Sequence, residues 1–216
     1  RAVKCPKTGA LYGLPCHANT VLKIVPGEVP EITEIGAGQC GEGQWKFHGG
    51  VLSPHDGCIY CIPTCAERVL KIDPATDQCE LIGGVFPGRN KWYGGLMGFD
   101  GRIYGTPQNA ANVLQIDPFT GECKAFGSLP EGGWKWHGGV VGPDGAMYGI
   151  PAHADTILKV VPGEVPVISE FGGPLRTGQH RTDGKYKYLG GVLGKDGCIW
   201  CMPSDTDYVL RIDCAA

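Results

Sequence analysis

Short apolar segments alternate with turn residues along the whole chain, and this alternation recurs at long intervals. Each repeat carries an apolar phrase of the form Ile-Tyr-Gly-x-Pro, which comes directly after a turn and shortly before a second apolar segment. In four of the five copies the turn contains Asp-Gly, a pair typical of tight β-hairpins. The pattern therefore predicts several short antiparallel strands in each repeat. The aromatic residues that mark the copies are Tyr12, Tyr60, Tyr104, Tyr148 and Trp200.

The repeat length of 44–52 residues predicts the architecture. Four-stranded units at this spacing are typical of β-propeller blades, because stacking the blades around an axis covers both faces of each sheet. A β-sandwich, the rival all-β architecture, has no reason to repeat at this interval. We expect an all-β protein with one propeller domain over residues 1–216 and an incomplete last blade. The five units are 1–44, 45–89, 90–133, 134–184 and 185–216.

A longer period is superimposed on the repeat. Residues 11–36 match residues 147–172 at 17 of 26 positions, and the second unit resembles the fifth in the same way. A period of three units suggests a parent ring of six blades, with rings of five or seven left open.

The composition agrees with this architecture. Gly and Pro supply 36 and 17 of the 216 residues, which excludes long helices. Because 42% of the residues are hydrophobic and only 19% are charged, a disordered chain is excluded too. No apolar stretch has the length of a transmembrane helix, and a net charge of −3 gives no attraction to nucleic acid. The chain begins at Arg1, so we expect a processed or truncated terminus; the compartment, an organellar or secreted precursor included, and peripheral association stay open.

The units resemble the repeats of the Kelch-like, YVTN and WD40 group of propellers. The motif is Lys-Trp-x-Gly-Gly-Val-Leu-x-x-Asp-Gly-x-Ile-Tyr-Gly-Ile-Pro followed by Val-Leu-x-Ile-Asp-Pro, and it is most similar to repeats in proteins of algae and other protists. The resemblance covers nearly the whole chain, although the Trp-Asp pair of WD40 repeats is absent. It implies a propeller fold and a role in interaction, and it carries over no catalytic residue.

Candidate binding residues gather on one face of the expected disk. Each inner strand begins with a Lys-aromatic-x-Gly-Gly phrase, and two antiparallel strands separate it from the loop after Ile-Tyr-Gly-x-Pro, so both features lie at the same level. Cations and aromatic rings near a central channel suit a carboxylate, a phosphate or a carbohydrate. We expect a ligand or partner face here, with the four lysines forming a ring of positive charge at one opening of the channel. The candidates are Lys46, Lys91, Lys135, Lys187, Trp45, Trp92, Trp134, His48, Tyr93, His137, His17, Asn109 and His153.

A structural role is the alternative for each candidate, with aromatic rings packed between blades and lysine stems covering them. Two CxxC motifs, Cys58 to Cys61 and Cys198 to Cys201, have a spacing often seen in zinc or redox sites. Each lies in an expected strand, where residues three positions apart point to opposite faces. We therefore expect four mostly buried thiols and no bound metal, and we expect no cofactor.

These observations leave different classes of function open. The leading interpretation is a non-enzymatic propeller that acts as a binding or scaffold module, or as a subunit of a protein assembly, without catalytic residues. The alternative is a propeller enzyme of the lactonase or lyase type, which keeps a metal ion or a histidine in the central channel. A third interpretation, favoured by the aromatic residues, is a glycan-binding propeller.

Overall fold

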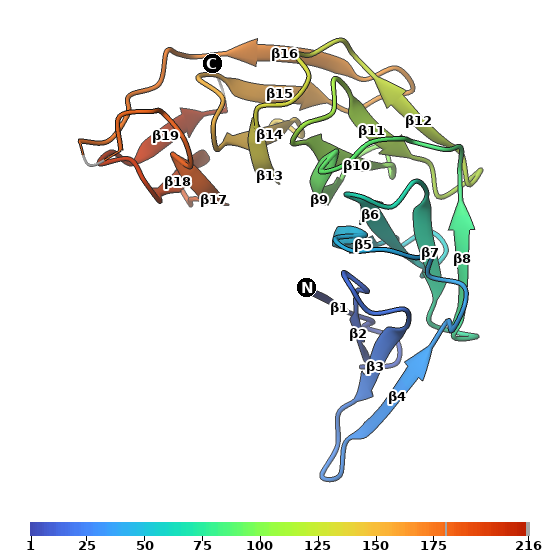
Figure 1. Ribbon diagram of the computed structural model, residues 1–216. Helices are drawn as coiled ribbons and strands as arrows, with labels where there is room; N and C mark the ends of the chain where they lie inside the picture. Colours follow the sequence, from blue (N-terminus) through green and yellow to red (C-terminus); the bar gives the residue numbers. More distant parts are fainter. Residues whose placement is uncertain (180, 215–216) are drawn as a thin grey trace.

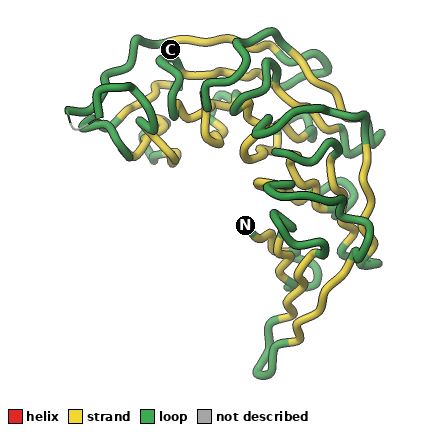
Figure 2. The backbone as a smooth tube through the Cα atoms, viewed as in Figure 1, coloured by secondary structure: helices red, strands yellow, loops and turns green. Residues whose placement is uncertain are grey.

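The computed structural model describes residues 1–179 and 181–214, which form five antiparallel sheets connected by turns and loops. Figure 1 shows the sheets side by side in an arc, and Figure 2 shows the same path made of strands and loops. The all-β propeller fold is therefore confirmed, and each sheet is called a blade below. Among the described residues no helix is long and apolar enough to cross a membrane.

The strands of each blade follow one another from the inner edge of the arc to its outer rim (Figure 1). Blade 1 contains β1 (Ala2–Lys4), β2 (Leu11–Gly13), β3 (Val21–Val25) and β4 (Glu31–Ile35). Blade 2 contains β5 (Phe47–Leu52), β6 (Ile59–Pro63), β7 (Val69–Asp73) and β8 (Gln78–Ile82). Blade 3 contains β9 (Trp92–Met97), β10 (Ile103–Pro107), β11 (Val113–Ile116) and β12 (Cys123–Phe126). Blade 4 contains β13 (Trp136–Val141), β14 (Met147–Pro151), β15 (Ile157–Val161) and β16 (Val167–Phe171). Blade 5 contains β17 (Tyr188–Leu193), β18 (Cys198–Pro203) and β19 (Leu210–Asp213), so the last blade is short, as expected.

The Asp-Gly turn and the aromatic residue of the repeated phrase hold each other in place. In blade 2 the Tyr60 hydroxyl donates a 2.7 Å hydrogen bond to one carboxylate oxygen of Asp56, and the Cys58 amide donates to the other. The next residue, Gly57, has a φ of 74°, a left-handed conformation that favours glycine. The phrase recurs because this contact closes the hairpin in several blades. The equivalent donors to the turn carboxylate are Tyr104, Tyr148 and Trp200.

The inner edges of neighbouring blades meet through glycine. The pairing of β5 with β6 shifts register between Phe47 and Gly50, which marks a β-bulge. Within the bulge Gly49 has a φ of 100°, and a Cβ atom added there would lie 2.8 Å from the Cα atom of Gly94 in blade 3. A Cβ atom on Gly94 would in turn lie 3.3 Å from the Cα atom of Gly138 in blade 4. Backbones therefore approach closely where the wedge of each blade is thinnest.

The core lies between the blades, and the CxxC strands show how it is filled. Cys61 packs toward blade 1, whereas Cys58 and Tyr60 pack toward blade 3. The expectation of mostly buried thiols is confirmed, since the four CxxC cysteines are at most 5% exposed. Burial raises the pKa of the Cys201 thiol to about 12 and raises that of Cys61 as well. These thiols are therefore protonated at neutral pH and act as small apolar side chains.

Candidate functional site

A pocket of about 460 Å³ opens beside the innermost strands, where blades 2, 3 and 4 meet. We call it the axial pocket. Its lining combines aromatic rings with a few polar groups, and it brings together five of the residues predicted for the ligand face. The lining residues are Trp45, His48, Thr64, Arg89, Asn90, Tyr93, Gln108, Trp134 and His137.

Three rings from successive inner strands form a row along the pocket. His48 stacks on Tyr93 with ring centroids 3.9 Å apart, and Tyr93 meets His137 at 3.7 Å. The three residues occupy the same position in β5, β9 and β13, directly before the positive-φ glycine of the bulge. Because the bulge redirects the strand at this point, repeat-related side chains come into contact across three blades.

Both imidazoles of this row are held in the neutral form. Burial lowers the pKa of His48 and of His137 to about 4, and the positive charge of Arg1 acts in the same direction. The Arg1 guanidinium lies over the Tyr93 ring, 5.0 Å from its centroid. The Nδ1 atom of His48 is buried without a hydrogen-bond partner within the described part of the chain. A buried polar atom without a partner is uncommon in folded proteins and calls for an explanation.

Two exposed tryptophans border the pocket on strained backbone. Trp45 and Trp134 are 49% and 38% exposed, and their φ angles are 55° and 49°. A bulky residue in the left-handed region costs about 1–3 kcal/mol. The side chain of Asn109 helps to hold this conformation, because its Oδ1 atom accepts a 2.9 Å hydrogen bond from the Trp134 amide.

The remaining predicted histidines lie beside these tryptophans. The ring of His17 meets Trp45 edge-on at 4.6 Å, and His153 lies 6.5 Å from Trp134 and 4.5 Å from Tyr186. Burial lowers the pKa of His153 as well. Both histidines pack on the tryptophans of the rim and do not belong to the lining of the axial pocket.

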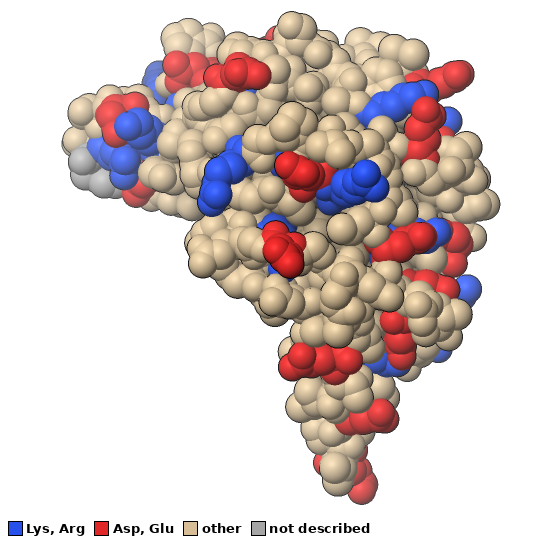
Figure 3. Space-filling view, turned by 45° about the vertical axis from the view of Figure 1, so that its right-hand side comes forward, with Lys and Arg blue, Asp and Glu red and all other residues tan. Residues whose placement is uncertain are grey.

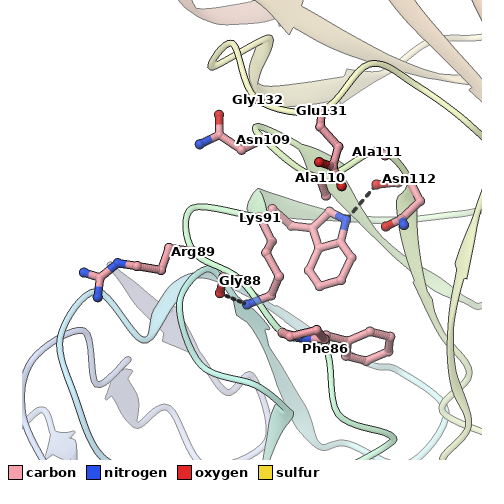
Figure 4. Close-up of a pocket in the computed structure, with 12 residues that line it drawn as sticks. Phe86, Gly88, Arg89, Lys91, Asn109, Ala110, Ala111, Asn112, Glu131 and Gly132 are labelled. Carbon is pink, nitrogen blue, oxygen red and sulfur yellow. Dashed lines mark hydrogen bonds between the residues drawn. The ribbon is translucent and has the colours of Figure 1, made fainter.

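The four lysines begin their strands as expected, but their environment differs from the expected ring of free charge. Each is at most 7% exposed, and its ammonium group donates to backbone carbonyls of nearby loops. Lys91 donates to Thr64, Ala66 and Gly88 over 2.9–3.3 Å, and Figure 4 shows its stem bent toward Gly88. Burial lowers its pKa to about 8. The equivalent bonds join Lys46 to Ala18, Lys135 to Ala110 and Gly132, and Lys187 to His153 and Gly184. Lys187 also donates to the side-chain carboxylate of Asp155 at 3.0 Å.

These contacts correct the expected role of the lysine charges. Each ammonium group donates to carbonyl oxygens that would otherwise be buried without a donor. These hydrogen bonds explain the presence of the lysines without a bound ligand. Trp92 is also internal: it is 2% exposed, and its indole Nε1 donates to the Asn112 carbonyl at 2.8 Å. On the face seen in Figure 3, Lys and Arg side chains lie among Asp and Glu side chains, and neither sign covers a continuous area.

Four lining residues were not predicted from the sequence: Thr64, Arg89, Asn90 and Gln108. Gln108 follows the proline of the repeated phrase. Arg89 and Asn90 directly precede Lys91, the lysine that begins the inner strand of blade 3. A signal for them exists in the sequence, because Asn90 and Gln108 depart from the residues that other blades carry at these positions. Comparing equivalent positions between repeats, rather than searching for motifs, finds them.

The described residues offer no group of three or more His, Cys, Asp or Glu side chains that could hold a metal ion. His48 and His137 lie on either side of Tyr93, whose ring separates the two imidazoles. The nitrogen ligands that the axial pocket supplies are therefore two at most.

Comparison with known proteins gives likeness in fold. No family model matches the sequence, and no curated protein matches it. Among solved structures, virginiamycin B lyase from Staphylococcus aureus is similar over 100% of this chain and 66% of its own, with a TM-score of 0.75 and 18% identity. A catalytically inactive His-to-Ala form of that lyase, solved with quinupristin, gives a TM-score of 0.72 at 18% identity over the same shares of both chains.

A putative 6-phosphogluconolactonase from Bacteroides uniformis is similar over 96% of this chain and 75% of its own, with a TM-score of 0.57 and 14% identity. At these identities the likeness concerns the fold. The chain spans less than two thirds of the length of the lyase chains that it matches. These neighbours are lyase and lactonase-like propellers. They support the propeller architecture that the sequence resemblance implied, but they do not support membership of the Kelch-like or WD40 group.

Proposed function

We propose that the protein is an enzyme that acts on a small organic substrate in the axial pocket, with His48 and His137 transferring protons. The observation that carries the proposal is the row of His48, Tyr93 and His137 rings beside a pocket of about 460 Å³. Pockets of this size, lined by apolar rings with a few polar groups, are typical of small-molecule sites. The likeness in fold to lyase and lactonase-like propellers favours the enzymatic alternative over a scaffold.

The chemistry follows from the state of the imidazoles. A neutral imidazole accepts a proton from carbon or water in the transition state and returns it to the leaving group. With a pKa of about 4, His48 and His137 are neutral near pH 7 but weak bases. A negative charge on a bound substrate raises the pKa of a neighbouring imidazole and strengthens it as a base. An elimination, or the hydrolysis of an ester or lactone, needs this proton transfer.

The residues of the pocket fit an enzyme that uses histidine better than an enzyme that uses a metal ion. A catalytic metal site in a protein commonly has three or more protein ligands. The described chain gathers no such cluster of His, Cys, Asp and Glu, whereas two imidazoles line the pocket.

The test is an activity screen on the intact chain. Compounds from the classes that the neighbours suggest, quinupristin and gluconolactone, are offered together with simple esters. We expect turnover of at least one compound. The turnover rate should fall by about 100-fold in His48→Ala or His137→Ala, as expected when a general base is removed. The matched control is His55→Ala, whose ring packs on Phe119 outside the pocket and whose loss should leave the rate unchanged. Equal rates in all three variants would refute the proposal.

A protein-binding module is the second candidate, and kinship with Kelch-like repeats stays with it. The observation in its favour is an apolar surface on blade 5, where Val192, Met202 and Val209 are 60%, 50% and 55% exposed. Contact of this surface with a second copy or another protein should be lost in the double substitution of Val192 and Met202 by Asp. Sedimentation velocity of the chain with and without the two substitutions measures self-association through this surface. A monomeric mass for both forms would remove the support.

A further inference from the structure

Blade 3 departs from the repeat at two positions, and both lie at the axial pocket. Where blades 2, 4 and 5 carry a large aromatic residue before the lysine, blade 3 carries Asn90. Where the other blades carry a small residue after the proline of the repeated phrase, blade 3 carries Gln108. The aromatic counterparts are Trp45, Trp134 and Tyr186, and the small counterparts are Cys16, Thr64, Ala152 and Ser204.

The first departure accounts for the space in the pocket. Asn90 shares the left-handed backbone of its counterparts, with a φ of 52°, so its side chain takes the place that an indole takes in blades 2 and 4. The asparagine side chain is much smaller, and its Oδ1 atom accepts a contact from the Cys65 sulfur at 3.7 Å. The smaller side chain thereby leaves space in the pocket that Trp45 and Trp134 also line.

The second departure supplies an unused donor. Gln108 is 1% exposed and lines the pocket, and its Nε2 atom has no hydrogen-bond partner within the described part of the chain. Buried amide groups are normally paired, because an unpaired one loses its bonds to water without replacement. An oxygen atom on a ligand satisfies this donor.

The charges at the pocket select the kind of oxygen. Arg89 lines the axial pocket, and Figure 4, which draws a second pocket that Arg89 also lines, shows its side chain extending away from the buried Lys91. Arg1 lies over the Tyr93 ring. Among the described residues that line the pocket, none carries a carboxylate. Cations without a lining carboxylate favour an anionic group, which guanidinium binds with two parallel hydrogen bonds.

We infer that the axial pocket takes an organic acid: a flat apolar ring lies between Trp45 and Trp134, and its carboxylate accepts hydrogen bonds from Gln108 and Arg89. This inference deepens the proposed function and rests on the same pocket. It also gives the histidine row its charge partner, because a carboxylate beside the row makes each imidazole a stronger base.

The experiment measures binding without turnover, by isothermal titration calorimetry with three probes that share a phenyl ring. Phenylacetate carries the anionic oxygen, phenylacetamide a neutral oxygen, and phenethylamine a cation. We expect phenylacetate to bind about tenfold more tightly than phenylacetamide, since hydrogen bonds between charged groups are roughly twice as strong as neutral ones. Phenethylamine should not bind. Equal binding of the amine and the acid would overturn the inference, and so would the absence of phenylacetate binding at millimolar concentration.

Variants that restore the repeat sharpen the test, because each introduces a residue that another blade already carries. Gln108→Thr should weaken phenylacetate and phenylacetamide alike by about tenfold, the loss of one hydrogen bond to a buried donor. Arg89→Gln should weaken the acid alone. Asn90→Trp should abolish binding by filling the space, with the fold kept as judged by circular dichroism. The matched control is Arg68→Gln, an exposed arginine outside the pocket, which should bind as the unchanged chain does.

The inference and the proposed function fail in different ways. Turnover is assigned to His48 and His137, whereas phenylacetate binding is assigned to Gln108 and Arg89, so different variants report on the two proposals. If the binding pattern holds and no compound is turned over, the organic-acid site stands and the enzyme proposal fails. If turnover is found and Gln108→Thr binds phenylacetate unchanged, the organic-acid site fails alone.

Discussion

Blades 2 and 5 contain nearly the same central strand in different surroundings. Residues 58–63, which contain β6, and residues 198–203, which form β18, share the order Cys-Ile-aromatic-Cys before an apolar residue and proline. In blade 2 the side chain of Ile62 is fully buried, whereas its counterpart Met202 in blade 5 is 50% exposed. On the other face of the two strands the difference disappears, because Cys61 and Cys201 are both completely buried.

The difference teaches that the burial of a blade face depends on the neighbouring blade. Alternate residues of a strand point to opposite faces, so Cys201 packs toward blade 4 while Met202 points away from it. Ile62 belongs, with Leu114 and Ile116, to the buried cluster that joins blades 2 and 3. A repeat sequence therefore fixes which residues are apolar, and position in the arc decides which of them lose contact with water.

The largest predicted contrast is in stability. Ile62→Ala should lower the free energy of unfolding by about 3 kcal/mol, because it removes buried methyl groups and leaves a cavity. Met202→Ala should cost less than about 1 kcal/mol, since half of that side chain is already in water. Urea denaturation monitored by tryptophan fluorescence measures both. Equal losses would mean that the face of blade 5 is covered in solution.

Removal of the buried lysine should destabilise blade 3 and blade 5 equally. Lys91→Met and Lys187→Met should each cost about 2 kcal/mol, because both leave buried carbonyl groups without a donor. The two lysines are 5% and 1% exposed, so blade 5 is as well sealed at this level as blade 3. The same urea titrations apply, with Lys124→Met on the exposed strand β12 as the control. A cost confined to Lys91 would show that the lysine contacts depend on the next blade.

The smallest contrast concerns acid. The pKa of His48 and His137 falls from 6.5 in the unfolded chain to about 4 in the folded one, so the folded state resists protonation. Their contribution to stability is complete above pH 6.5 and is lost as the pH falls toward 4. Blade 5 carries Leu189 at this position, and the double substitution of both histidines by Leu should reduce the loss in Tm between pH 7 and pH 5 by several °C. Differential scanning calorimetry measures this, and parallel curves for the two proteins would contradict the shifted pKa values.

The fold could be predicted from the sequence because the repeat is explicit. The aromatic residue, the Asp-Gly turn and the flanking apolar segments recur at nearly constant spacing, and a single contact such as that of Tyr60 with Asp56 explains why they recur together. The position of His48, Tyr93 and His137 could be predicted too, since equivalent positions of an inner strand lie at one height. Their stacking could not, because it depends on a bulge that Gly49 permits.

The lysines mark the limit of the sequence argument. A lysine that begins an inner strand is equally consistent with a free charge and with a buried donor. What decides is the number of loop carbonyls that surround its ammonium group, and Lys91 has three. Gln108 was missed for another reason: it belongs to no motif, and only a comparison of equivalent positions between the repeats sets it apart, while its burial is known from the fold alone.

The glycine contacts at the inner edge have a consequence for the shape of any ring built from these repeats. Each blade is a wedge, and the distance between neighbouring backbones at its tip sets the angle through which the arc turns per blade. Gly49 and Gly94 allow the tips to approach to the contact distance of bare backbone. An alanine at either position would thicken the tip, reduce the turn per blade and widen the circle. Curvature, and with it the number of blades that can close a ring, is thus encoded by the absence of a methyl group.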